Sequence, residues 1–499
     1  MTTPQPAEHG DDAESGSTSP TTLGAIRVVV EAGWVARVAA LQVACIETHR
    51  SCRGCQSFRL RIARKTPRKV YHDKFAGGGD GADVTTGKTK SSRLVLPRVV
   101  RLLYDLNKFD LKPGLRLPLE ILSIVFGTAF GDSVDSIAWP PGLESLVFWR
   151  RFNRTLDNVE FPRSLKKLEL SSSFNQSVVD AKWPPELEVL SLGSWFDQPL
   201  SGVTFPDSLT TLNLSRDFNQ PIEDVVWPKQ LRRLTFGFFF SRSIETAARK
   251  WPATLEHLQL GDCYNLPIRD VEWPAGLLEI YFGRGFNQQL EGASWPPALR
   301  KLKFGGMFDQ DIAAAGFPEG LEELELGFAF NRPLANVALP SGLKRLVLGE
   351  EFNRDVEGVL WPPGLEEIRF GVQFDRPVSA VAWPRGLRRL EFGETFNKPL
   401  AGVAFPHGLR EVTFGKCFNQ EVDGVHWPDS VEVMGFGENF NQPIVGVEWP
   451  ASLVTLRLGC DFDRTMQQGV VFPPGLRKVE FVDSYRRVDE HGHDDDRAP

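Results

Sequence analysis

The sequence predicts a β-rich repeat solenoid in which each coil contributes one short strand. The first observation is a Trp-Pro, Phe-Pro or Leu-Pro step that recurs 17 times between residues 117 and 473, so that 17 of the 36 prolines share one repeat position. The second is the period, because 14 of the 16 intervals are 22 residues. The third is a glycine ten residues after the aromatic in 13 of the 17 units. A fixed period of this length is typical of repeat architectures.

One unit, residues 383–404, shows how a coil is built. Leu390 and Phe392 alternate with polar Arg389 and Glu391, which is the periodicity of a strand. Gly393 follows and indicates a turn in which a side chain is unwelcome. The rest of the unit is short and rich in proline, which favours extended or irregular backbone, with room for one 3₁₀ turn, over a regular helix.

We therefore expect a leucine-rich-repeat-like array of about 17 coils with little helix. Its parallel strands should lie about 4.8 Å apart along an arc of roughly 80 Å. Equivalent aromatic and leucine side chains should form buried columns, since one coil cannot cover its own apolar face. The array should be monomeric.

The residue after the repeated phenylalanine is Asn in ten units and Asp in four. These two residues share a side-chain oxygen acceptor, whereas only Asn has an NH₂ donor. We interpret the position as a structural ladder in which the oxygen accepts backbone N–H groups in a tight turn. The ladder residues are Asn153, Asn175, Asn219, Asn331, Asn353, Asn397, Asn419 and Asn441.

The run WPxxLxxLxFGxxFNQPI resembles the FNIP repeat family. Its core reads FNQPI at Phe218–Ile222 and Phe440–Ile444, and FNKPL at Phe396–Leu400. The resemblance covers about residues 117–485 and implies a leucine-rich-repeat-like interaction scaffold without catalytic residues. The sequence departs from the family in favouring Trp-Pro over Leu-Pro.

Charge and composition divide the chain into further segments. Residues 1–21 are polar, which predicts disorder, and residues 22–46 are predicted as an amphipathic helix. Residues 47–93 form a basic segment and a flexible linker, residues 94–116 a degenerate cap coil, residues 117–485 the solenoid, and residues 486–499 a polar disordered tail. Residues 1–46 contain 2 Lys/Arg and 5 Asp/Glu, and residues 47–116 contain 17 Lys/Arg and 6 Asp/Glu. The remainder contains 38 Lys/Arg and 53 Asp/Glu.

The basic cluster at residues 50–74 has three interpretations. It can be a solvated linker, a nuclear address, or a patch that binds phosphates of nucleic acid or an anionic surface. Only Phe58 and Tyr71 interleave it, so base stacking has little support. We expect a cytoplasmic protein, with the nucleus as the alternative compartment. We find no apolar run long enough for a transmembrane helix.

The start of the array also allows two interpretations. Leu117–Phe126 superficially resembles the opening of an F-box, a module that can accompany such repeats. The repeat interpretation is preferred, because Ile121, Ile124 and Phe126 fall on the repeat positions.

No motif predicts catalysis, a cofactor or a metal. Cys45, Cys52 and Cys55 form one loose cluster with a single CxxC, whereas a zinc site needs a second pair or histidines at ligand spacing. The eight histidines are scattered. We therefore predict a protein without enzymatic activity.

The residues that alternate with the buried strand positions are the candidate binding residues. They should form adjacent columns on the concave face of the array, where a protein partner would bind. The alternative is that neighbouring coils neutralise each other through exposed ion pairs. The candidate residues are Glu323, Glu325, Arg345, Glu367, Arg369, Arg389 and Glu391.

Overall fold

The computed structural model describes residues 25–29, 60–62, 101–105, 117, 119–128, 130–245, 251–463 and 468–482. In this part of the chain, twenty strands form one sheet and no helix is present. The strands are β1 (Ala25–Val29), β2 (Leu60–Ile62), β3 (Arg101–Asp105), β4 (Ser123–Phe126), β5 (Ser145–Phe148), β6 (Lys167–Glu169), β7 (Val189–Ser191), β8 (Thr211–Asn213), β9 (Arg233–Thr235), β10 (His257–Gln259), β11 (Glu279–Tyr281), β12 (Lys301–Lys303), β13 (Glu323–Glu325), β14 (Arg345–Val347), β15 (Glu367–Arg369), β16 (Arg389–Glu391), β17 (Glu411–Thr413), β18 (Val433–Gly435), β19 (Thr455–Gly459) and β20 (Lys478–Val482).

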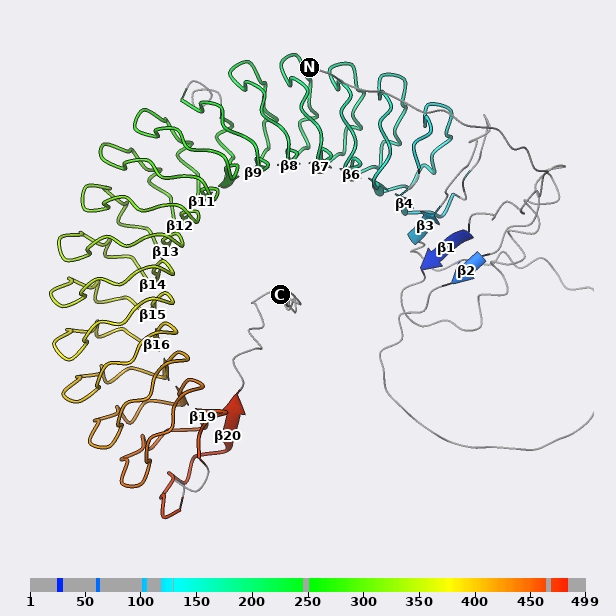
Figure 1. Ribbon diagram of the computed structural model, residues 1–499. Helices are drawn as coiled ribbons and strands as arrows, with labels where there is room; N and C mark the ends of the chain where they lie inside the picture. Colours follow the sequence, from blue (N-terminus) through cyan, green and yellow to red (C-terminus); the bar gives the residue numbers. More distant parts are fainter. Residues whose placement is uncertain are drawn as a thin grey trace, which may run out of the picture.

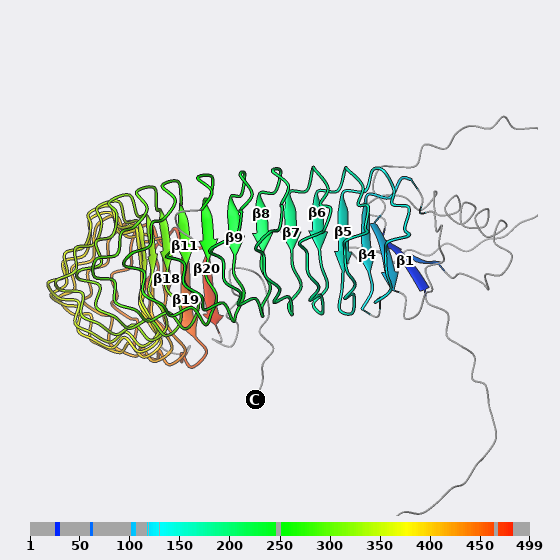
Figure 2. The same ribbon diagram turned by 90° about the horizontal axis from the view of Figure 1, so that it is seen from above.

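The predicted solenoid is confirmed. From β3 to β20 each strand pairs in parallel with the next, and equivalent residues of successive coils face each other, as Leu346 faces Ile368. The coils follow an arc with the strands along its inner edge (Figure 1). Seen from above, the strands stand side by side (Figure 2). The concave face is therefore a continuous parallel sheet.

The period-2 pattern gives each strand one buried face and one outward face. The middle residue of each three-residue strand points inward, and Leu346 and Leu390 are fully buried. Their neighbours Arg345, Val347, Arg389 and Glu391 are half-buried on the concave face. A single buried residue per three-residue strand cannot hold a coil alone, so stability depends on the adjacent coils.

Three reverse turns close each coil in place of a helix. In the unit at 383–404 and its continuation, Phe396 N donates to Gly393 O, Val403 N to Leu400 O, and Leu409 N to Pro406 O. In the last turn the acceptor is the carbonyl oxygen of a proline, a residue that has no backbone N–H and so needs no acceptor of its own. The proline-rich half of the unit is therefore extended backbone between turns.

Aromatic side chains fill the interior in columns. The rings of the FN position stack from coil to coil, and Phe396 lies between Phe374 and Phe418 with centroid distances of 6.0 and 6.1 Å and nearly parallel planes. A second column contains the phenylalanine at the strand end, as in Phe392 and Phe414 at 5.1 Å. These side chains bury on the order of 150–250 Å² each, and so dominate the core.

The turn glycine is required by the close approach of consecutive coils. A Cβ at Gly371 would lie 1.8 Å from Gly349 O, and one at Gly393 would lie 1.7 Å from Gly371 O. Where serine replaces the glycine, its hydroxyl turns into the core: Ser171 Oγ donates to Phe152 O and Ser215 Oγ to Phe196 O.

At the amino-terminal end the structure differs from one prediction. Within residues 22–46, predicted as a helix, the described residues Ala25–Val29 form strand β1, so the helix was wrong for these five residues. Ile26, Val28 and Val29 are β-branched and favour a strand, and β1 pairs antiparallel with β3 and parallel with β2. The rest of the predicted helix lies outside the described residues.

The segment at 94–116 contributes β3, which pairs with β4 at the same 22-residue offset as the later coils. β4 itself takes the repeat position, so Leu117–Phe126 begins a coil and not an F-box. The predicted disordered segments at 1–21 and 486–499, the Cys45–Cys55 cluster, and the basic cluster at 50–74 apart from β2 lie outside the described residues.

Candidate functional site: the concave sheet and its edge

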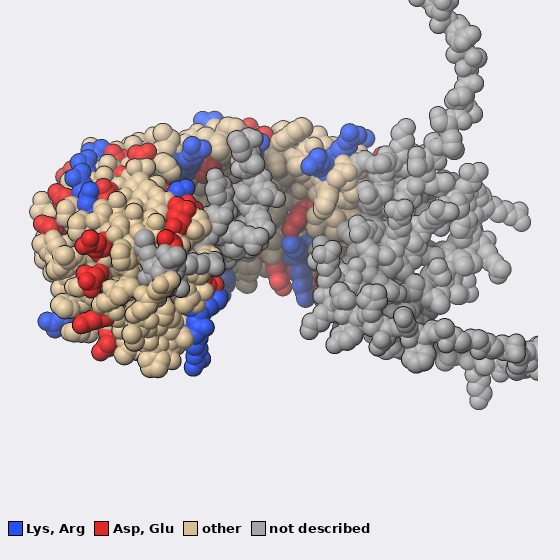
Figure 3. Space-filling model, turned by 60° about the horizontal axis from the view of Figure 1, so that its bottom comes forward, with Lys and Arg blue, Asp and Glu red and all other residues tan. Residues whose placement is uncertain are grey.

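The concave face presents two outward columns of side chains, from the first and third residues of each strand. Charged residues concentrate between β12 and β17, whereas β7 and β8 carry Val189, Ser191, Thr211 and Asn213. Figure 3 shows acidic and basic residues interspersed among uncharged ones on the side of the arc that it views. On the concave face the charged columns contain both signs, as in Lys301, Glu323, Arg345 and Glu367.

The candidate binding residues contact the charges of neighbouring coils. Within the columns, opposite charges stand one coil apart, at distances of 2.7 to 3.6 Å. The ion pairs are Lys301–Glu323, Lys303–Glu325, Arg345–Glu367, Arg369–Glu391 and Arg389–Glu411. These side chains are between about a quarter and half exposed, so each pair contributes about 0–1 kcal/mol. The pairs fix the positions of the charges more than they stabilise the fold.

The Asn/Asp ladder runs along one flank of the array. Asn175 N donates to Asn153 Oδ1, Asp197 N to Asn175 Oδ1, and Asn219 N to Asp197 Oδ1, each at 2.9 Å. The same bond links successive coils from Asn265 to Asp463. Asn and Asp are interchangeable here because only the acceptor oxygen is used. These side chains are occupied by the backbone of the next coil.

A small polar cluster lies on the concave face between β10 and β11. His257 Nδ1 lies 2.7 Å from Glu279 Oε2, and the Tyr281 hydroxyl donates to the same oxygen at 2.9 Å. Partial burial alone would raise the pKa of Glu279, but the hydrogen bonds from His257 and Tyr281 lower it below its usual value. Burial, with the bond to Glu279, raises the pKa of Tyr281. The cluster holds an ionised carboxylate and a neutral phenol at neutral pH.

Sequence reasoning missed this cluster. The signal was available, because His257 and Glu279 occupy the same position of adjacent coils, 22 residues apart. The described residues contain no group of three or more His, Cys, Asp or Glu side chains that could hold a metal ion. Nor does this described part of the chain contain a helix that is long and apolar enough to span a membrane.

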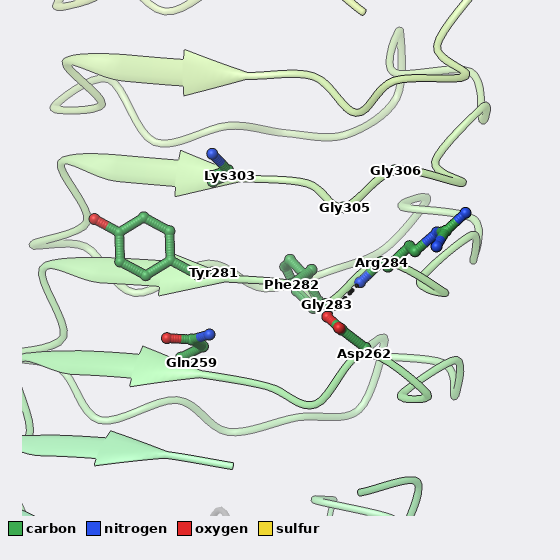
Figure 4. Close-up of a pocket in the computed structure, with 9 residues that line it drawn as sticks. All are labelled: Gln259, Asp262, Tyr281, Phe282, Gly283, Arg284, Lys303, Gly305 and Gly306. Carbon is green, nitrogen blue, oxygen red and sulfur yellow. Dashed lines mark hydrogen bonds between the residues drawn. The ribbon is translucent and has the colours of Figure 1, made fainter. Parts of the chain in front are cut away.

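A shallow groove of about 430 Å³ lies where the concave face meets the turns that follow the strands (Figure 4). Gln259, Tyr281 and Lys303 form one side, in a row across three parallel strands. The other side is the turn backbone, where Arg284 N donates to Asp262 Oδ1 at 3.0 Å. The floor contains Phe282, Gly283, Gly305 and Gly306.

The turns beside this groove form a flank that we call the exit-turn edge. It consists of the two residues after the turn glycine, or its replacement, in each coil, such as Phe238–Phe239 and Glu350–Glu351. Backbone bonds join each turn to the next: Cys263 N donates to Phe238 O, and Gly285 N to Asp262 O. The edge is thus held in place by the main chain, independently of its side chains.

Sequence comparison identifies one repeat family in the chain. The FNIP Repeat model matches residues 152–194, 196–239, 286–329 and 330–373. No curated protein matches the chain.

Among solved structures, the chain is similar to CroV588, described as a novel circular LRR protein. The two are 34% identical with a TM-score of 0.66, over 73% of this chain and 53% of that chain. This chain therefore spans about half the length of CroV588.

Two more distant structures also align. An internalin from Listeria monocytogenes is 14% identical, over 73% of this chain and 88% of that one, with a TM-score of 0.35. A chain of the Toll–Spatzle complex of Drosophila is 11% identical, over 78% and 55%, with a TM-score of 0.48.

Proposed function

We propose that this chain, whose repeats match the FNIP Repeat model and form a leucine-rich-repeat-like solenoid, is a non-enzymatic scaffold that binds a protein partner on its concave strand face. The observation that carries the proposal is the in-register parallel sheet on the inner side of the arc. It sets two columns of variable side chains side by side, at a spacing of about 4.8 Å. The concave surfaces of solenoids are binding surfaces for this geometric reason.

The charge pattern between β12 and β17 would define the partner. The ion pairs along the columns hold the guanidinium and carboxylate groups in fixed positions, as in Arg345–Glu367 at 3.2 Å and Arg369–Glu391 at 2.7 Å. A partner of complementary pattern would associate with on-rates that fall as salt rises. Glu323, Glu325, Arg389 and Glu391 extend the same surface.

The test must change the pattern without breaking the pairs. The partner is first captured from cells by cross-linking to the full chain, identified and purified. Binding is then measured with two swapped pairs, Arg345→Glu with Glu367→Arg and Arg369→Glu with Glu391→Arg. Each swap keeps an ion pair but reverses the sign of the charge at both positions. We therefore expect the affinity for the partner to fall at least tenfold, while the melting temperature of the protein stays within a few degrees.

The control is the same swap at an exposed pair outside the strand columns, Asp207→Lys with Lys229→Asp, where the charges lie 3.1 Å apart. It should leave binding unchanged. If this control and the concave swaps reduce affinity equally, or if none does, the concave face is not the binding surface.

Binding of nucleic acid or an anionic surface through residues 50–74 remains the alternative predicted from sequence. Its direct test is salt-dependent retention on a polyanion by the full chain, compared with a variant in which the basic residues of 50–74 are replaced by serine.

A further inference from the structure

Exposed apolar side chains gather on the exit-turn edge. Of the six exposed aromatic residues in the described part of the chain, five lie at the turn that follows a strand, which is more than scattered exposure would produce. They are Trp149, which takes the place of the turn glycine, and Trp195, Phe238, Phe239 and Phe328, which lie on the exit-turn edge together with exposed Met307.

The fold does not require these side chains. Equivalent positions of other coils carry Ser172–Ser173, Glu350–Glu351 and Glu394–Thr395, and these coils have the same turn and the same backbone bonds. The rings of Phe238 and Phe239 are about 40% exposed and contact each other and the guanidinium of Arg216. Their presence therefore points to a ligand outside the core.

The apolar residues form two shoulders around the groove. Phe238 and Phe239 follow β9, whereas Met307 follows β12 and Phe328 follows β13. Between them the edge carries Asp262–Cys263 and Arg284–Gly285, which include no large apolar side chain. Neighbouring coils are 6.2–6.3 Å apart at the interior aromatic column in this region. With strands about 4.8 Å apart, shoulders three to four coils apart are separated by about 15–25 Å, the span of five to seven extended residues.

Arg284 supplies a positive charge between the shoulders. The Arg284 side chain extends from the turn and passes close to Gly306 (Figure 4). A Cβ added to Gly306 would lie 3.3 Å from Arg284 Cγ. No described carboxylate lies within ion-pairing distance of its guanidinium, whereas the other cation of the groove, Lys303, is paired with Glu325 at 2.7 Å. Asp262 is engaged by Arg284 N. A guanidinium can bind a carboxylate with two parallel hydrogen bonds, and this one lies between two pairs of exposed apolar side chains.

We propose that the exit-turn edge from Phe238 to Phe328 is a second docking site, which binds an extended segment of a partner protein that carries an acidic residue between two large apolar residues. The apolar side chains lie against Phe238–Phe239 and Met307–Phe328, and the acidic side chain pairs with Arg284. The hydrogen-bonded turns preform the site, so little ordering cost opposes binding. The site is separate from the concave columns and does not depend on the function proposed for them.

The test is a random peptide library displayed on phage and selected against the full chain, followed by synthesis of the enriched peptides. We expect sequences in which Asp or Glu lies between two large apolar residues, within a window of about seven. Three variants borrow residues from equivalent coil positions and so preserve the fold: Phe238→Ser with Phe239→Ser, Met307→Gln with Phe328→Glu, and Arg284→Glu. Each should weaken peptide binding at least tenfold, and Arg284→Glu should remove the preference for the acidic residue.

Two controls separate this site from the rest of the molecular surface. Leu360→Gln removes an exposed apolar side chain elsewhere, and the swap Arg345→Glu with Glu367→Arg alters only the concave face. Both should bind the peptides like the wild type. If selection enriches no such peptides, or if the peptides bind the edge variants unchanged, the proposal fails, whatever the concave swaps do to the captured partner. Sedimentation tests whether the edge instead joins two copies of the chain. A dimer that is dissociated by the double variant Phe238→Ser with Phe239→Ser, and with which no peptide competes, would show that the peptide proposal is wrong.

Discussion

At Gly371 the spacing between coils excludes even a methyl group. The turn of one coil lies on the carbonyl of the equivalent glycine in the previous coil, and these close approaches recur along the array. The glycine is needed for space and not for a left-handed backbone, which occurs instead at Gly358 and Gly402 in another turn. In the coils that carry it, this glycine therefore sets how closely consecutive turns approach.

We predict that Gly371→Ala destabilises the array by at least about 3 kcal/mol, because a Cβ would lie 1.8 Å from Gly349 O. The measurement is urea denaturation followed by circular dichroism. Gly320→Ala is the matched control, since a Cβ there meets nothing within 4 Å. Equal unfolding midpoints for the two variants would contradict the clash.

Tyr264 is the one described exception in the FN column of phenylalanines. Its ring stacks between Phe240 and Phe286 at 6.3 Å on each side, and its fully buried hydroxyl has no hydrogen-bond partner among the described residues. Burial raises the pKa of this phenol, and the nearby charge of Glu245 adds to the effect. The hydroxyl therefore costs stability in this column.

We predict that Tyr264→Phe stabilises the fold by about 1 kcal/mol, the lower end of the cost of an unsatisfied buried polar group. Because the pKa of Tyr264 is raised in the folded state, its titration leaves the free energy of unfolding unchanged below about pH 10, the pKa of the unfolded chain. Above that pH the unfolded chain ionises first, and the free energy of unfolding of the wild type falls. The advantage of the variant should thus grow above pH 10. Denaturation midpoints from pH 7 to 11 measure this; a constant or shrinking difference would show that the hydroxyl is solvated.

At the scale of the element, the coil is a strand and three turns joined by side-chain hydrogen bonds to the next coil. The ladder oxygen of Asn331 accepts from Asn353 N at 3.0 Å, and that of Asp309 accepts from Asn331 N at 2.9 Å. The two residue types therefore serve the same turn. In this chain the repeated Phe-Asn or Phe-Asp pair supplies one buried ring and one acceptor oxygen for the next coil.

We predict that Asn331→Leu destabilises the array by about 1–3 kcal/mol, because it leaves the N–H of Asn353 without a partner. Asn331→Asp keeps the acceptor and should change stability by less than about 1 kcal/mol. Native-state hydrogen exchange of the Asn353 amide provides a local measurement. Protection that survives Asn331→Leu would show that another group satisfies this amide.

At the scale of the molecule, coil count, strand positions and columns were predictable from the sequence because one period fixes them all. For the charged residues the sequence left two alternatives, partner binding and ion pairs between coils. The pairing of the strands places Arg345 beside Glu367 and shows that the ion pair forms. The exposed aromatic edge was not predicted. Phe238 and Phe328 belong to the same residue type as the core, and only comparison of turn positions among coils separates them.

The array should tolerate the loss of one whole coil but not half of one. We predict that deletion of residues 341–362 joins equivalent positions, keeps every column continuous, and leaves a cooperatively folded protein. Deletion of residues 341–351 places polar residues in the columns and should abolish the cooperative thermal transition measured by circular dichroism. Similar melting of both variants would contradict the in-phase stacking.

The unequal spacing of strands and rings has a consequence for size. Strands lie about 4.8 Å apart, whereas the deeper rings are about 6.1 Å apart, as between Phe352 and Phe374. Each coil is thus a wedge, and identical wedges turn the chain by the same angle at every step. The width of the mouth between the two ends then depends on coil number alone. CroV588, of which this chain matches 53%, is described as circular. Gain or loss of coils would change the width of the opening through which a partner enters the arc, whereas the radius of the arc, which the wedge sets, would stay the same.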